Sequence, residues 1–103
     1  PSLSPEQRQA ALAKAAVARQ ERAEVKNRLR HGGTTLFEVI TQAQHDETIA
    51  KMRVYDVLQC LPGLGKVRAR QMMERVGIAE SRRMRGLGAK QIEGLKREFG
   101  LRV

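Results

Sequence analysis

The sequence predicts an all-α protein in which one long N-terminal helix precedes a compact bundle of shorter helices. Three observations lead to this fold class. A half-buried strand alternates between apolar and polar side chains, and no run of residues in this sequence does so. Apolar residues instead recur at helical spacing through the middle and end of the chain. Neither Gly nor Pro interrupts residues 6–30, as expected for one uninterrupted helix.

The first helix is expected to begin at Ser4-Pro5 and to end at His31-Gly32-Gly33. Ser4 and Gln7 have the spacing of a capping box, and Pro5 occupies the first helical position. On a helical wheel an apolar stripe lies beside a basic stripe. The apolar stripe contains Ala11, Ala18, Val25 and Leu29, and the basic stripe contains Arg8, Arg19, Lys26 and Arg30.

The basic stripe is open to two interpretations: a surface that lies against phosphates, or an ordinary solvated face supported by local pairs such as Glu24 with Arg28. The heptad-like spacing of Ala11, Ala18 and Val25 leaves a weak homodimer open. Alanines make a thin seam, so we expect a monomer in solution.

The middle of the chain predicts short core helices. Thr35 and Glu38 form a second capping box before a segment that is nearly all apolar, through Ala43. Residues 46–61 continue at helical spacing, either as two short helices or as one kinked helix.

The most informative motif is the turn Leu61-Pro62-Gly63-Leu64-Gly65-Lys66, which joins one helix to the next in the pattern of a helix-hairpin-helix. Gly63 and Gly65 are expected to adopt backbone angles closed to other residues and to let the main chain approach a phosphate. The free amides and positive dipole of the following helix would then face the anion. Gly77 is expected to cap this helix at its C-terminus.

A second Gly-Leu-Gly turn, residues 86–88, again precedes a helix, whose apolar face carries Ile92, Leu95 and Phe99. Arg82, Arg83 and Arg85 come just before this turn, and arginine forms forked hydrogen bonds with phosphate oxygens. We expect both Gly-Leu-Gly turns to lie on one side of the bundle and to hold phosphates across a groove.

Charge and composition narrow the function. The formal net charge is +9. Residues 1–33 contain seven basic and three acidic side chains, residues 34–60 contain two basic and four acidic, and residues 61–103 contain eleven basic and four acidic. A polyanion is therefore the expected partner. The single Cys60 excludes an intrachain disulfide, and with only two histidines we expect no metal and no cofactor. Because no segment has the length of a membrane span, we expect a cytoplasmic protein and no membrane partner.

Taken in order, four pieces of the chain resemble the actinobacterial integration host factor family, over nearly the whole length. These pieces are residues 23–29, Gly32-Gly33, residues 65–69 and residues 82–88. The resemblance implies a helix-two-turn-helix DNA-binding domain at residues 34–103, preceded by the long basic helix at residues 1–33, with both parts in a single folded domain. It also implies a nucleoid-associated protein that binds double-stranded DNA with little sequence specificity, bends or condenses it, and assists integrase complexes in site-specific recombination.

The resemblance assigns DNA contacts to the two turns and the helices after them: Gly63, Leu64, Gly65, Lys66, Arg68, Arg70, Arg82, Arg83, Arg85, Gly86, Gly88 and Lys90. It also suggests a second DNA surface on the first helix, at Arg19, Lys26 and Arg30.

Two other functions are weighed against this one. A ribosomal RNA-binding protein of the same fold would suit the charge, although the chain lacks a long basic tail. An enzyme is not expected, because Asp46, Glu47 and Asp56 do not have the spacing of a metal cage. The amine of Pro1 would also need an aromatic base pocket that the composition does not supply.

Overall fold

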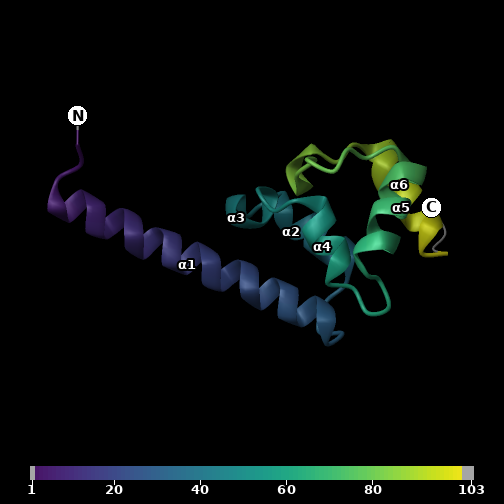
Figure 1. Cartoon of the computed structure of the whole chain (residues 1–103), viewed down its shortest axis with the longest axis horizontal. Helices are drawn as coiled ribbons and strands as arrows, with labels where there is room; N and C mark the ends of the chain where they lie inside the picture. Colours follow the sequence, from purple (N-terminus) through teal and green to yellow (C-terminus); the bar gives the residue numbers. More distant parts are fainter. Residues whose placement is uncertain (1, 101–103) are drawn as a thin grey trace.

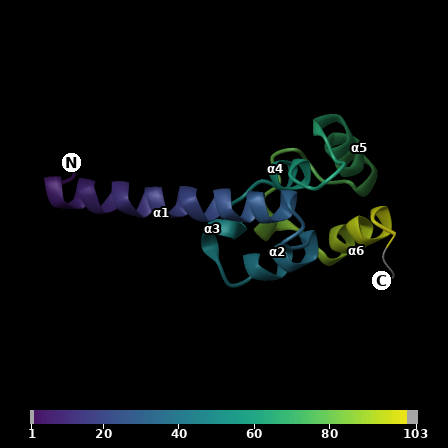
Figure 2. The same cartoon turned by 90° about the horizontal axis from the view of Figure 1, so that it is seen from below.

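The structure is a computed structural model that describes residues 2–100, and it is helical as expected. The long helix α1 spans Pro5–Arg30. Ser4 caps it: the Ser4 hydroxyl accepts a hydrogen bond from the Gln7 amide, and the Gln7 side chain accepts one from the Ser4 amide, so the predicted capping box is confirmed. The first half of α1 extends beyond the other helices, and the described part of the molecule measures 51 × 29 × 25 Å (Figures 1 and 2).

Five further α-helices and one 3₁₀ turn form the bundle. In chain order they are α2 (Leu36–Ala43), α3 (Glu47–Ala50), α4 (Val54–Gln59), α5 (Lys66–Val76), η1 (Met84–Gly86) and α6 (Ala89–Glu98). Residues 46–61 therefore form two short helices, which settles the alternative left open by the sequence. Within residues 2–100 the only strand-like pairing is an isolated antiparallel bridge between Arg53 and Arg83.

Local capping explains where α2 and α3 start. The Thr35 hydroxyl accepts from the Glu38 amide at 3.2 Å, and the Asp46 carboxylate accepts from the Thr48 amide at 2.9 Å. The second predicted capping box is only half formed, because the Glu38 carboxylate accepts instead from the Thr34 hydroxyl at 2.8 Å. Gly77, with φ of 86°, closes α5 as predicted.

One apolar core joins all parts of the bundle to the second half of α1. Its largest fully buried side chains come from α1, α4, α5 and α6: Leu29, Leu58, Met73 and Leu95. No polar or charged side chain within residues 2–100 is buried. Val25 is also completely buried inside the protomer, whereas Ala11, another residue of the seam considered for a homodimer, is exposed.

The first half of α1 has a different environment, because residues 5–17 are all exposed. Leu12 and Val17 keep 66% and 65% of their surface accessible. We call residues 5–17 the arm. No helix within residues 2–100 combines the length and apolar character needed to cross a membrane.

Candidate nucleic-acid interface

The turn between α4 and α5 presents bare backbone to solvent. Gly63 has φ of 78°, as predicted, but Gly65 has φ of −100° and ψ of −175°. The expectation that Gly65 needs angles closed to other residues was wrong, since extended backbone of this kind suits any residue. At either position an added Cβ would meet no protein atom within 4 Å. The two glycines therefore leave a side-chain-free surface at which a ligand can approach the main chain closely.

The N-terminus of α5 opens onto this surface. Gly65 is the N-cap and has no side chain, so no capping group covers the first amides of the helix, at Lys66 and Val67. The dipole of α5 places partial positive charge there. Lys66 and Arg68 are exposed beside it. Arg68 Nη1 also donates to the Gly63 carbonyl at 3.0 Å, which braces the turn.

Two other residues assigned to this turn have structural partners. Leu64 is half-buried and packs against the core, so its side chain anchors the turn. Arg70 forms an ion pair with Glu80 at 2.6 Å and lies 5.9 Å from the centre of the Tyr55 ring. Glu80 raises the pKa of Arg70 above its ordinary value. The structure thus does not bring Arg70 to Gly63 and Gly65.

The second turn leads into α6 in a similar way. Gly88 is the N-cap of α6 and contributes no side chain, so the amides of Ala89 and Lys90 are free of capping groups. Gln91 Oε1 accepts from the Gly88 amide at 3.1 Å. Lys90 is exposed next to this helix end.

The three arginines before this turn differ in their surroundings. Arg82 is half-buried, and its Nη1 donates to the Gly86 carbonyl at 2.7 Å. Arg83 is exposed, and its Nη1 donates to the Lys51 carbonyl at 3.0 Å. Arg85 is exposed on η1, and within residues 2–100 no hydrogen bond or ion pair engages its guanidinium. The sequence alone gives no reason to rank these three side chains.

The two Gly-Leu-Gly turns lie apart on the bundle, and their placement on one side across a groove stays a prediction. In Figure 1 the turn between α4 and α5 lies at the lower edge of the bundle, whereas η1 lies at the upper edge. η1 packs against α2 and α3. The molecule therefore carries exposed glycine backbone at two separate turns.

A basic cleft lies between α1 and the bundle. It has a volume of about 290 Å³ and collects five cationic side chains and one carboxylate. Its charged lining residues are Arg22, Lys26, Lys51, Arg53, Asp56 and Arg83, and we call this set the α1 cleft. A neighbouring groove of about 570 Å³ shares Arg22 and Lys51 and continues along the arm.

Of the residues predicted for a second surface, Lys26 lines the α1 cleft, whereas Arg19 and Arg30 are exposed and lie outside its lining. The sequence reasoning missed Arg22, Lys51 and Arg53. Arg22 is one turn before Lys26 on the same helix, which was an available signal. Lys51 and Arg53 lie in a segment of net negative charge, so the charge distribution along the sequence does not indicate a basic surface there.

Two carboxylates modulate the charge beside α1. Glu47 pairs with Lys51 at 3.1 Å, and this contact, with smaller effects from Lys14 and Arg85, lowers the pKa of Glu47. The Glu21 carboxyl of α1 lies beside Asp46 at the start of α3, and the interaction of the two groups raises the pKa of Glu21 and lowers that of Asp46.

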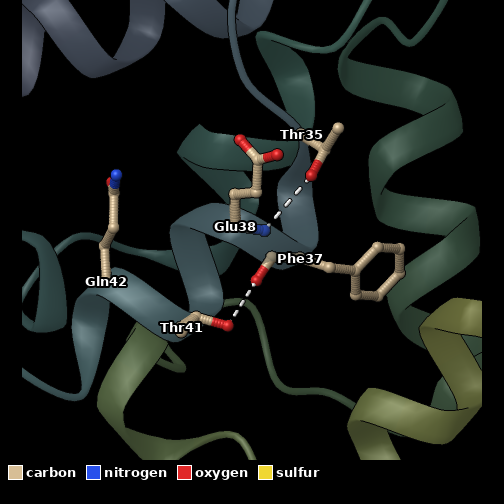
Figure 3. Close-up of a pocket in the computed structure, with 5 residues that line it drawn as sticks. All are labelled: Thr35, Phe37, Glu38, Thr41 and Gln42. Atoms are coloured by element: carbon tan, nitrogen blue, oxygen red, sulfur yellow. Dashed lines mark hydrogen bonds between the residues drawn. The ribbon is translucent and has the colours of Figure 1, made fainter.

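A separate hollow of about 490 Å³ lies on the outer face of α2 (Figure 3). Its hydroxyl groups serve the helix itself: Thr41 Oγ1 donates to the Phe37 carbonyl at 3.0 Å, and Thr35 caps the helix. The Phe37 ring extends from α2 and meets Phe99 edge to face, with ring centres 6.2 Å apart. We assign no ligand to this hollow.

Other chemistry-bearing groups are few in the part of the chain that the structure describes. Within residues 2–100, no three His, Cys, Asp or Glu side chains come together as metal ligands would. Cys60 is buried, and its thiol donates to the Asp56 carbonyl at 3.3 Å. Pro1, considered above as an amine nucleophile, lies outside the described residues.

Comparison with known proteins identifies relatives that share this architecture. Residues 29–99 match the model of the S13-like H2TH domain. The chain is 65% identical over 100 residues to an integration host factor of Streptomyces coelicolor, covering 97% of this chain and 94% of that protein. It is 50% identical over 100 residues to an integration host factor of Mycobacterium tuberculosis, covering 97% and 95%. A solved structure of sIHF bound to an 8 bp palindromic DNA matches with a TM-score of 0.82 and 64% identity, covering 85% of this chain and 99% of that one.

Proposed function

This chain belongs to the actinobacterial integration host factor family and has its S13-like H2TH fold, and from that premise we propose that it is a nucleoid-associated architectural protein that binds duplex DNA. It grips the phosphate backbone with little sequence specificity, bends or compacts the DNA, and assists integrase-mediated site-specific recombination. It acts without catalysis, in the cytoplasm, as a monomer.

The observation that carries the proposal is the exposed backbone at the first turn. Gly63 and Gly65 leave the main chain uncovered, and the uncapped amides of α5 open onto the same surface. Amides and a helix dipole bind a phosphate oxygen without contacting a base, so they carry no sequence information. Lys66 and Arg68 add charge at the rim.

The second contact region is proposed at η1 and the start of α6. There Arg85 offers an unengaged guanidinium, and Gly86, Gly88 and Lys90 surround the free amides of α6. We propose that DNA which meets both this region and the first turn bends around the protein, or that two DNA segments are held at once. Either arrangement shapes DNA without a protein dimer.

We further propose that the α1 cleft extends this DNA surface. Its five cations come from α1, from the junction of α3 with α4, and from Arg83, just before η1. Arg19 and Arg30 remain candidates at its margin. In this view residues 1–33 contribute a basic helix along the DNA, while residues 34–103 supply the helix-two-turn-helix contacts.

Fluorescence anisotropy on matched DNA duplexes of several sequences, over a salt series, tests the proposal with wild-type protein, Arg85→Ala and Arg97→Ala. Arg97 is exposed in the last turn of α6 and is not among the residues proposed to contact DNA, so its variant removes the same charge as a control. We expect sequence-tolerant binding that weakens steeply with salt. Arg85→Ala should lower the slope of log affinity against log salt by about 0.9, the value for one phosphate contact, whereas Arg97→Ala should leave it near wild type.

Duplex RNA in the same assay tests the alternative of a ribosomal RNA-binding protein, which the match to the S13-like domain also supports. Preference for RNA would replace the DNA proposal. A changed sequence preference in Arg85→Ala would indicate base readout instead of backbone binding.

A further inference from the structure

Gln91, in the first turn of α6, connects three parts of the chain that surround the second turn. Its Nε2 donates to the Gly77 carbonyl at 3.1 Å, which ties α6 to the end of α5. Its Oε1 accepts from the Gly88 amide at 3.1 Å and from Arg82 Nη1 at 3.4 Å. One uncharged side chain thus holds the end of one helix, the start of the next and an arginine between them.

Arg82 completes this arrangement from the other side. Its Nη1 donates to the Gly86 carbonyl at 2.7 Å, and its side chain lies across Gly86. A Cβ at Gly86 would approach Arg82 Cδ to 2.8 Å, so the missing side chain of Gly86 makes room for the arginine. Arg82 and Gln91 are both half-buried. The guanidinium therefore points into the loop and bonds to it.

The neighbouring arginine shows the contrast. Arg85 lies on η1, three residues after Arg82, and extends into solvent. For Arg82 to reach a phosphate through Nη1, it would have to give up the bonds of that atom to Gly86 and Gln91. Arg85 gives up no bond within residues 2–100, so phosphate contact costs it less.

We propose that Arg82 and Gln91 are positioning residues, which hold η1 and the start of α6 so that Arg85 and the free α6 amides meet the phosphate, and that Arg82 itself makes no phosphate contact. The inference rests on the proposed function for its binding readout. The arrangement of the loop can also be tested in the absence of DNA.

The first experiment measures amide hydrogen exchange of residues 84–91 in the free protein. Arg82→Ala, Arg82→Lys and Gln91→Leu should each accelerate exchange in this segment, because each removes a bond that holds the turn. Arg97→Ala serves as the matched loss of one arginine and should leave the segment unchanged. Unaltered exchange in the Arg82 and Gln91 variants would overturn the proposal that these two side chains hold the turn, whether or not the protein binds DNA.

The second experiment measures duplex DNA affinity by anisotropy. Gln91→Leu, which alters no charge, should weaken binding about three- to ten-fold, and Arg82→Ala by a similar factor. Arg82→Lys should not restore affinity, because the shorter lysine side chain does not place its ammonium at the position of Nη1, the atom that bonds both Gly86 and Gln91. The double variant Arg82→Ala/Gln91→Leu should bind no more than about two-fold more weakly than either single variant, since both act on one arrangement.

Three binding results would contradict the proposal: wild-type affinity in Gln91→Leu, rescue by Arg82→Lys, or multiplication of the two losses in the double variant. The last two would identify Arg82 as a direct phosphate ligand. If the wild-type protein itself fails to bind DNA, the proposed function fails, and the exchange experiment still decides whether the two side chains hold the turn.

Discussion

Gly94 in the middle of α6 offers a quantitative test of how α5 and α6 are packed. Alanine normally stabilises a helix interior relative to glycine by about 1 kcal/mol. At Gly94, however, a Cβ would lie 2.8 Å from Val76 Cγ1 and 3.5 Å from both Val76 Cβ and Cγ2. Val76 is β-branched and stiff, and rotation would only bring another methyl group toward the new atom. Relief requires the helices to separate.

Overpacking of this kind costs about 1–3 kcal/mol. After the gain in helix propensity, Gly94→Ala should lose about 1 kcal/mol, which corresponds to a fall in Tm of about 4–8 °C for a domain of this size. Thermal unfolding followed by far-ultraviolet circular dichroism measures it. Val76→Ala/Gly94→Ala should be more stable than Val76→Ala alone, because the obstructing methyls are gone and the helix gain remains. A Gly94→Ala protein as stable as wild type would refute the close packing of the two helices at this point.

Three further substitutions test other parts of the structure. Glu47→Gln removes the carboxylate beside the α1 cleft and should tighten DNA binding about two- to five-fold at low salt in the anisotropy assay. Glu74→Gln removes an exposed carboxylate elsewhere and is the control. An equal gain in affinity in both variants would show that net charge alone is the cause. Glu21→Gln should raise Tm by a few degrees at most at pH 7. The raised pKa of Glu21 means that its carboxyl favours the fold when protonated and loses that contribution as pH rises through the folded pKa, so the gain in Glu21→Gln should vanish toward acid pH. A gain that persists at acid pH would exclude repulsion from Asp46 as its cause. Gly77→Ala forces alanine to φ of 86° and should lower the free energy of unfolding, measured in urea, by roughly 1–2 kcal/mol. An unchanged urea midpoint would argue against the left-handed cap.

Much of the fold was predictable because its signals are local. The capping box at Ser4 and the stop at Gly77 depend on residues within one helical turn of each other, and both are confirmed. Apolar residues at helical spacing likewise identified the core helices, since each of these must bury one face. The failure of the box at Thr35 is equally local: Thr34 supplies a hydroxyl that competes for Glu38.

The details of the candidate site depend on long-range contacts, and the sequence could not supply them. Arg82 and Arg85 have the same chemistry in the same short motif, yet Arg82 alone is turned inward, by the Gly86 carbonyl and by Gln91, which lies nine residues after it. The α1 cleft exists because Lys51 and Arg53 fold back beside α1. Glycine at 86 makes room for a side chain, whereas glycine at 65 leaves the main chain open, a difference that residue type alone cannot show.

The arm of α1 has a thermodynamic consequence of its own. Residues 5–17 are all exposed, so their helical state depends mainly on the Ser4 cap and on backbone bonds within the arm. Isolated helices of this length are marginal in water, and their helix content falls gradually on warming. The arm should therefore fray over a broad temperature range while the core remains intact, well before cooperative unfolding. Any ligand that lies along the arm must supply the free energy to order it, so its affinity should fall with temperature faster than that of a ligand held by the bundle alone.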